Sequence, residues 1–275
     1  PGGRGLFSMG APMVMDEGNG GILLNCSFVS TEELKDDFSG PFCFLFSASS
    51  HGIGVGFDLL GAGKVVITEP NTTENIMIIA DSREGWCDAL KITLDAYAGI
   101  GALPKFDYSK IRPFGSKLKR FGGTASGPEA LRILLEEDIP KILIPGKITS
   151  TQIVDVMNVI GKCVVAGGAR RSAELALGNI NDHEFITMKG DQEKVKDYRW
   201  ASNNSVNCPP NYKDFKKFVD PIMTNGEPGF IWLENCRNYG RMNGIKDISD
   251  VKIKGCNPCS EQQLESYEMC VDGNT

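Results

Sequence analysis

The chain has 275 residues, of which 41% are hydrophobic and 23% charged, so it can bury a core and is not intrinsically disordered. The formal net charge of −6 argues against a basic nucleic-acid surface and against a polybasic membrane anchor. No apolar run approaches the ~18 residues that span a bilayer. We therefore expect a globular chain with no nucleic-acid partner and no membrane partner.

The two ends of the chain suggest a piece of a longer protein. The first residue is Pro1 rather than Met, and residues 271–275 stop without any closing feature. The nine cysteines are an odd number at low density, which is untypical of a small disulfide scaffold. Because no signal segment is present, these thiols favour a reducing, cytoplasmic location.

Apolar periodicity predicts short strands that alternate with longer helices. Residues 21–30 read as a buried strand, and Thr31 begins a segment that looks like a capped helix. Three further helices are expected, at 82–98, after Pro128 and at about 151–161. The other strand-like runs are 163–166, 173–177 and 229–233. This alternation indicates an α/β architecture, and because no linker divides the chain we treat residues 1–275 as one incomplete domain.

Three glycine-rich segments are candidates for ligand contact. The first, Gly52-x-Gly54-x-Gly56, lacks the GxGxxG spacing of dinucleotide-binding folds. It favours a backbone that passes close to a ligand or to another strand. The second, residues 122–128, leads into a helix whose free N–H groups can hold a phosphate, with an ordinary helix entry as the alternative.

The third glycine-rich segment carries two adjacent arginines. Gly167 and Gly168 are followed by Arg170, Arg171 and Ser172, between a helix and a strand. Guanidinium groups bind phosphate in a bidentate manner, so the segment suits an anionic ligand. A solvated basic turn is the alternative.

Cys256 and Cys259 form a C-x-x-C pattern. A zinc site needs two more ligands at short spacing, and only Cys270 is near. A thioredoxin-like site needs the pattern at the start of a helix after an early strand, whereas this one lies close to the end of the chain. We therefore expect no metal site.

A second pattern, Asn257-x-Cys259-x-Glu261, overlaps the first. In extended backbone these three side chains point to the same side. An amide, a thiol and a carboxylate that face one spot suit chemistry on a hydroxylated substrate. The thiol or its thiyl radical is the reactive centre, and the carboxylate takes a hydroxyl proton.

Residues 257–261, Asn-Pro-Cys-Ser-Glu, resemble the finger-loop motif of the ribonucleotide reductase catalytic subunit. Other stretches agree with that family in the same order: residues 25–28, 54–57, 81–86, 122–128, 167–173, 202–206 and 226–229. The combination is most similar to the adenosylcobalamin-dependent class II enzymes, in particular the monomeric ribonucleoside-triphosphate reductases. The resemblance spans nearly the whole chain.

The resemblance implies a fold and a set of partners. The family has a ten-stranded α/β barrel of two half-barrels, and this chain resembles the first half-barrel plus the central finger loop. The second half-barrel and the C-terminal redox tail are not in this sequence. The implied ligands are a ribonucleotide substrate, adenosylcobalamin as cofactor, and a deoxynucleotide effector near residues 82–98 and 105–120. A thioredoxin-like protein is the implied reductant, and a second chain that completes the barrel is a further partner that a half-barrel allows.

The resemblance also implies roles for single residues. Cys259 would form the thiyl radical that abstracts the 3′ hydrogen, Glu261 would accept the 3′-hydroxyl proton, and Asn257 would orient the ribose hydroxyls. Cys26 and Cys270 match the pair that supplies two electrons and ends as a disulfide. Their Cα atoms are then expected to lie within ~7 Å of each other.

Two further features follow from the resemblance. Asn25 and the loop with Gly167, Gly168, Arg170, Arg171 and Ser172 are expected to contact the substrate and to relay effector identity to base choice. Cys256 departs from the family, which usually has no cysteine at this position. Two alternatives stay open: a class I large subunit with a separate metalloprotein radical source, or a non-catalytic nucleotide-binding fragment.

Overall fold

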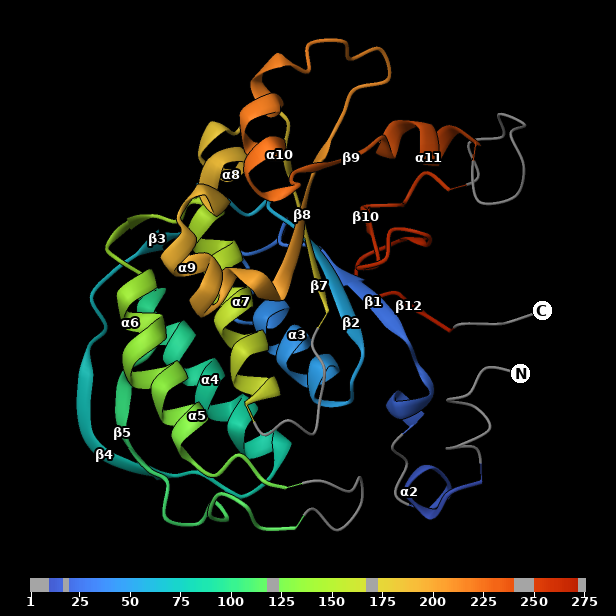
Figure 1. The fold of residues 1–275 in the computed structure, drawn as a ribbon. Helices are drawn as coiled ribbons and strands as arrows, with labels where there is room; N and C mark the ends of the chain where they lie inside the picture. Colours follow the sequence, from blue (N-terminus) through green and yellow to red (C-terminus); the bar gives the residue numbers. More distant parts are fainter. Residues whose placement is uncertain (1–9, 17–19, 118–123, 167–172, 240–249, 272–275) are drawn as a thin grey trace.

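The computed structural model describes residues 10–16, 20–117, 124–166, 173–239 and 250–271. A six-stranded sheet of order β12-β1-β2-β7-β8-β9 runs through it (Figure 1). Five of these strands are mutually parallel, and β12 pairs antiparallel with β1. The strands are β1 (Cys26–Val29), β2 (Gly54–Asp58), β7 (Glu174–Asn179), β8 (Ser202–Asn207), β9 (Gly229–Ile231) and β12 (Met269–Cys270).

Helical connections join the parallel strands, as a parallel ladder requires. Figure 1 shows α3 and α7 on one side of the sheet and β10 on the other. The connecting helices are α3 (Gly40–Ser50), α7 (Ser150–Val165), α8 (His183–Thr187), α9 (Gln192–Asp197) and α10 (Val219–Asn225). The α/β prediction is confirmed, and the five parallel strands agree with half of a ten-stranded barrel.

The core lies between the sheet and the helices. Val29, Val55 and Phe57 point from β1 and β2 into one large apolar cluster, where they meet Leu45 of α3 and Met157 of α7. We call this side of the sheet the outer face. Because successive residues of a strand point to opposite sides, Cys26, Phe28, Gly54 and Gly56 lie on the other side, the inner face. Cys26 and Phe28 belong there to a separate small cluster with Leu264 and Cys270.

The residues that follow β2 and precede α7 in the sequence form an additional layer of the fold. Its α4 packs on α3, and its β4 and β5 form a separate parallel pair. Ser82 caps α4, because its Oγ accepts a hydrogen bond from Gly85 N at 3.0 Å. The elements of this layer are β3 (Val66–Ile67), β4 (Thr72–Ile78), α4 (Arg83–Tyr97), β5 (Leu103–Asp107), α5 (Glu129–Ile133), a π-helix (Leu134–Asp138), α6 (Ile139–Ile142) and β6 (Gly146–Lys147).

The remaining elements are short. A two-stranded antiparallel hairpin, β10 with β11, lies near the inner face, where β10 contacts β1 and β2. The other elements are α2 (Pro12–Met15), α11 (Leu233–Tyr239), β10 (Gly255–Cys256), β11 (Gln263–Leu264) and 3₁₀ helices at Gly20–Leu23, Met188–Gly190, Arg199–Ala201 and Lys216–Phe218. Within the described part of the chain, no helix combines the length and the apolar character that a membrane crossing needs.

Most predicted elements are present, two predictions are wrong, and two predicted strands are too long. The strand predicted at 21–30 is limited to β1, because Gly20–Leu23 form a 3₁₀ helix. The expected helices at 82–98, after Pro128 and at 151–161 correspond to α4, to the α5–α6 stretch and to α7. The strand predicted at 163–166 is the end of α7, which continues to Val165. Thr31 does not cap a helix, because its Oγ1 donates to Asp58 on β2 and residues 32–36 form turns. The strand at 229–233 ends at Ile231, since α11 begins at Leu233.

Candidate active site

The hairpin of β10 and β11 presents a tight turn of residues 257–262. Asn257 N donates to Gln262 O at 3.0 Å, and Ser260 N donates to Asn257 O at 2.9 Å. The Asn257 side chain also holds the turn, because its Oδ1 accepts from Gln262 N at 3.0 Å. Ser260 has a φ of 67°, in the left-handed region that tight turns use. Cys259 is thereby exposed in this turn, whereas Asn257 is fully buried.

Glycines of β2 allow the turn to lie directly on the inner face. A Cβ on Gly56 would stand 1.9 Å from the backbone oxygen of Cys256, and one on Gly54 would stand 3.1 Å from Cγ of Pro258. Gly255 itself lies against the ring of Phe28, which a Cβ would meet at 2.1 Å. Gly54 and Gly56 therefore lie on a strand that another backbone segment approaches closely, as predicted, and the segment is not a dinucleotide loop; Gly52 lies in the turn before β2.

Cys26 and Cys270 face each other across the sheet edge. They are Cα partners in the antiparallel register of β1 and β12. Opposite residues of such a pair have Cα atoms about 4.5–5.5 Å apart, and disulfides need about 4.4–6.8 Å. The expected proximity of the two residues is thus present in the fold, while their redox role stays a prediction. Both thiols are buried.

The Asn257 amide connects the turn to this thiol pair. Its Nδ2 donates to Glu261 Oε1 at 2.7 Å and reaches Cys270 Sγ at 3.8 Å. One buried amide therefore contacts a carboxylate and a thiol of the predicted site. The exposed Glu261 carboxylate is accessible from outside, so the amide links a buried thiol to a surface acceptor.

The other four predicted catalytic and redox residues all lie close enough to Cys26 to affect its pKa. Burial raises the pKa of the Cys26 thiol to about 12, and the nearby thiols of Cys270 and Cys259 act in the same direction. A hydrogen bond with Asn257 opposes this shift of the pKa, and Glu261 contributes a further small rise. Cys26 consequently keeps its proton at neutral pH and can serve as a hydrogen donor.

The family comparisons agree with this geometry. Residues 60–143 match the family model described as the insertion domain of B12-dependent ribonucleotide reductase. A solved structure of a B12-dependent, class II ribonucleotide reductase superposes with a TM-score of 0.83 at 30% identity, over 98% of this chain and 45% of that chain. The chain belongs to the class II ribonucleotide reductase family.

Curated members of this family cover the same region. The chain is 47% identical to the adenosylcobalamin-dependent ribonucleoside-triphosphate reductase of Euglena gracilis and 42% identical to the probable one of Dictyostelium discoideum. In both cases 98% of this chain and 38% of the relative are covered. The chain thus spans less than half of the length of these curated relatives. The family model sets residues 60–143 apart as one unit, and the single-domain assignment for residues 1–275 stays a prediction.

The predicted specificity residues are placed only in part. Asn25 precedes β1, and its Nδ2 reaches Cys26 Sγ at 3.6 Å, so it belongs to the same site as the thiol pair. Gly167, Gly168, Arg170, Arg171 and Ser172 lie outside the described residues. So do Gly122 and Gly123 of the second glycine-rich segment. Its Gly127 has a φ of +71° and packs on the backbone of Phe114.

Sequence reasoning assigned no role to two polar residues of the inner face. Asn203 and Ser205 of β8 pair in register with Leu175 and Leu177 of β7. These two leucines share a small cluster with Cys256, so all four side chains point to the inner face of the sheet. Their spacing of two residues indicates that both side chains point to the same face of a strand. It does not indicate which face of the sheet is the inner one.

The C-x-x-C pattern does not form one compact site. Cys256 is fully buried beside Leu175 and Leu177, whereas Cys259 is exposed. Burial raises the pKa of Cys256 to about 11, and its Sγ contacts Ser260 Oγ at 4.0 Å. Among residues with described positions, no group of three or more His, Cys, Asp or Glu side chains is arranged to hold a metal ion.

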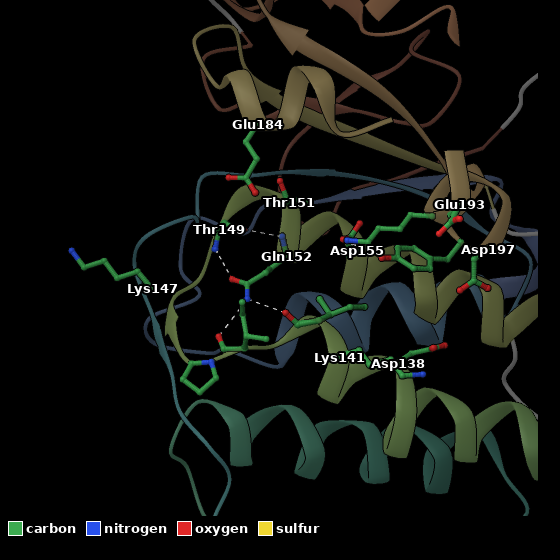
Figure 2. Close-up of a pocket in the computed structure, with 15 residues that line it drawn as sticks. Asp138, Lys141, Lys147, Thr149, Thr151, Gln152, Asp155, Glu184, Glu193 and Asp197 are labelled. Carbon is green, nitrogen blue, oxygen red and sulfur yellow. Dashed lines mark hydrogen bonds between the residues drawn. The ribbon is translucent and has the colours of Figure 1, made fainter. Parts of the chain in front are cut away.

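A pocket on the helical side of the sheet contains none of the predicted site residues. It has a volume of about 740 Å³ and lies among α6, α7, α8 and α9 (Figure 2). Its charged lining residues are three lysines, Lys141, Lys147 and Lys194, and five acids, Asp138, Asp155, Glu184, Glu193 and Asp197, so acidic groups outnumber basic ones. A lining with an excess of acidic groups does not favour a nucleotide phosphate, so the inner face keeps the candidate active site.

Proposed function

We propose that this chain supplies the first half-barrel and the thiol centre of an adenosylcobalamin-dependent ribonucleoside-triphosphate reductase. Such an enzyme converts ribonucleotides to 2′-deoxyribonucleotides. The observation that carries the proposal is the register of Cys26 with Cys270 beneath a turn that holds Cys259. The names of the relatives, which include adenosylcobalamin and a triphosphate substrate, support the choice of cofactor and substrate.

Cys259 is the proposed site of the thiyl radical. Because Cys259 is exposed in the turn, its sulfur is accessible to a substrate and to a radical source. The thiyl abstracts the 3′ hydrogen of the ribose, so the S–H bond forms as the C–H bond breaks. Glu261 then accepts the 3′-hydroxyl proton, and the buried Asn257 amide, which already contacts Glu261 Oε1 at 2.7 Å, orients the hydroxyls.

Cys26 and Cys270 are the proposed source of the reducing electrons. The 2′ hydroxyl leaves as water, and the two thiols supply two electrons and two protons as they form a disulfide. The 3′ hydrogen then returns from Cys259 to the ribose. The high pKa of Cys26 suits this role, because a protonated thiol is the form that donates hydrogen. A thioredoxin-like protein would reduce the disulfide again by thiol–disulfide exchange.

The exposure of one thiol in the candidate site is consistent with adenosylcobalamin as the cofactor. Of the three thiols in the site, Cys26 and Cys270 are buried and only Cys259 is exposed, so Cys259 is the residue that would face the cofactor. When bound, adenosylcobalamin supplies radical chemistry by cleavage of its cobalt–carbon bond. The protein contributes the shielding of Cys26 and Cys270 and the positioning of Cys259 by the turn.

The remaining partners are also part of the proposal. A deoxynucleotide effector would bind near α4 and residues 105–120 and would act on the substrate site through the loop at 167–172. The rest of the protein, or a second chain, would complete the barrel beside β9 or β12, the two edge strands of the sheet. We place the protein in the cytoplasm, where its nine cysteines would stay reduced.

The deciding experiment measures nucleotide reduction with and without adenosylcobalamin. The full-length protein that carries this chain is incubated with a ribonucleoside triphosphate and a dithiol, and deoxynucleotide is quantified by chromatography. We expect product only with adenosylcobalamin. Product that requires a metalloprotein instead would indicate the class I alternative, and nucleotide binding without product would indicate a non-catalytic role.

Cysteine variants then separate the proposed roles. Cys259→Ser should abolish product and leave nucleotide binding unchanged, whereas Cys26→Ser and Cys270→Ser should block repeated turnover with a dithiol reductant. Cys163→Ser is the matched control, because Cys163 is buried in the outer cluster, away from the inner face. Normal cycling in both Cys26→Ser and Cys270→Ser would show that the reducing pair lies elsewhere.

A further inference from the structure

A second pair of cysteines lies far from the proposed active site, between two helices. Cys43 is on α3 and Cys87 is on α4, and both are half-buried free thiols. Cys43 Sγ lies 3.9 Å from the backbone oxygen of Cys87, and Cys87 Sγ lies 3.8 Å from the backbone oxygen of Cys43. Each sulfur therefore lies against the backbone of the other cysteine, and both side chains lie in the interface between α3 and α4.

Polar contacts on both sides of the pair hold the two helices in antiparallel order. Arg83, at the start of α4, contacts the imidazole of His51, which follows the last residue of α3. Lys91 Nζ, farther along α4, donates to Ser39 Oγ at the start of α3 at 3.0 Å. Cys43 and Cys87 lie between these two contacts, so the packing of the helices keeps the thiols together.

The electrostatic surroundings of the two thiols differ. A hydrogen bond from Cys43 lowers the pKa of Cys87, and the positive charge of Arg83 acts in the same direction. The same hydrogen bond and burial raise the pKa of Cys43. Opposite shifts of this kind suit a dithiol in which one sulfur attacks first and the other resolves the mixed disulfide.

We propose that Cys43 and Cys87 are a second disulfide-forming dithiol, which reacts with low-molecular-weight disulfides such as oxidised glutathione. The Cys87 thiolate attacks one sulfur of the small disulfide, forms a mixed disulfide and releases one small thiolate. Cys43 loses its proton to solvent and attacks the Cys87 sulfur, which releases the second small thiolate. Two protein thiols are thereby oxidised, and one small disulfide is reduced to two thiols.

The new bond would join the helices of the central sheet to the segment that matches the insertion-domain model. Cys43 belongs to the helix that covers the outer face of the sheet, and Cys87 belongs to the segment that matches the insertion-domain model. The disulfide would fix α4 on α3 at the middle of their contact. This inference does not depend on the reductase activity, because neither residue takes part in the proposed reaction.

Peptide mapping tests the proposal directly. The reduced full-length protein is incubated with oxidised glutathione, remaining thiols are blocked with N-ethylmaleimide, and the protein is digested with trypsin without reductant. Cleavage after lysine and arginine yields residues 36–64 with Cys43 and residues 84–91 with Cys87 as their single cysteines. We expect a cross-linked pair of these peptides that disappears after treatment with dithiothreitol.

Variants and unfolded protein sharpen the test. In Cys43→Ser, peptide 84–91 should instead carry one glutathione, while Cys163→Ser should leave the cross-link unchanged. The native yield should exceed the yield in urea by roughly tenfold, because the unfolded chain does not hold the two thiols together. Recovery of peptide 84–91 from the native wild type only as a glutathione or N-ethylmaleimide adduct would overturn the proposal, and so would equal cross-link yields with and without urea.

Discussion

The two faces of the central sheet are built from different residues, although the same strands form both. On the outer face, β1 and β2 present Val29, Val55 and Phe57, which are fully buried against helices. On the inner face, β2 presents Gly54 and Gly56, which leave room for a second backbone. The outer face therefore provides most of the apolar burial, and the inner face provides space for the turn that holds Cys259.

The polar contacts among the helices and those on the inner face also differ in what they hold in place. On the helical side, the buried Asp155 and Arg199 form a bidentate ion pair with two contacts of 2.7 Å. On the inner face, Asn257 bridges groups of the candidate site, one of which is exposed. Polar contacts among the helices thus stabilise the fold, whereas those on the inner face position groups that can react.

The largest expected effect breaks the ion pair on the helical side. Asp155→Ala leaves the Arg199 guanidinium buried without its carboxylate, so the free energy of unfolding should fall by about 3–5 kcal/mol. Urea denaturation of the variant and the wild type measures the difference. Glu74→Ala removes the exposed partner of Lys105 and should cost below about 1 kcal/mol. Equal losses in the two variants would contradict the assignment of Asp155 as a structural residue.

An intermediate effect is expected where a side chain is added to the inner face. Gly56→Ala places a Cβ against the backbone oxygen of Cys256, so the turn must shift, at a cost of about 1–3 kcal/mol. Gly54→Ala should cost less, because its nearest new contact is 3.1 Å. Gly190→Ala, with open space around it, is the matched control for both. Thermal unfolding should rank the three variants in that order, and an unchanged Gly56→Ala would mean that the turn does not lie on β2.

The smallest expected effect is the pH dependence that Cys26 causes. Its pKa is raised to about 12 in the folded chain, so the folded state holds this proton more tightly than the unfolded state does. The stabilising contribution is complete below the unfolded pKa and is lost as the pH rises towards 12. Between pH 8 and pH 10 we expect a loss on the order of 1 kcal/mol.

Urea unfolding of reduced wild type and of Cys26→Ser at pH 8, 9 and 10 isolates the Cys26 contribution. Other titrating groups, including the buried Cys163 and Cys256, are common to both proteins and cancel in the difference. The variant should therefore show a shallower fall in stability with rising pH. Identical slopes would indicate that Cys26 is more solvated than its burial implies.

Local patterns were reliable where the chain itself contains the signal. The helix at 82–98 was predictable because Ser82 caps it and its apolar residues recur on one face. The run at 163–166 was misread as a strand, because a short apolar run does not reveal whether it continues a helix. Thr31 was misread as a helix cap, because its actual partner, Asp58, lies 27 residues away.

In the candidate site, too, only features formed by neighbouring residues were predictable from the sequence. The motif at 257–261 was visible in the sequence because its residues are adjacent, and the family resemblance named Cys26 and Cys270 as a pair. The inner position of Asn203 and the Cys43–Cys87 contact had no such signal. Both depend on which strand or helix lies beside another, which adjacent residues do not encode.

The α/β class, the clear helices and the chemical groups available for a radical reaction can be inferred from the residues alone, because periodicity, capping and residue type are local properties. The register pairing of Cys26 with Cys270, 244 residues apart, and the space that Gly56 leaves for the backbone of the turn exist only in the folded chain. Long-range pairing depends on the packing of the whole sheet against its helices. No short segment of the chain contains that information.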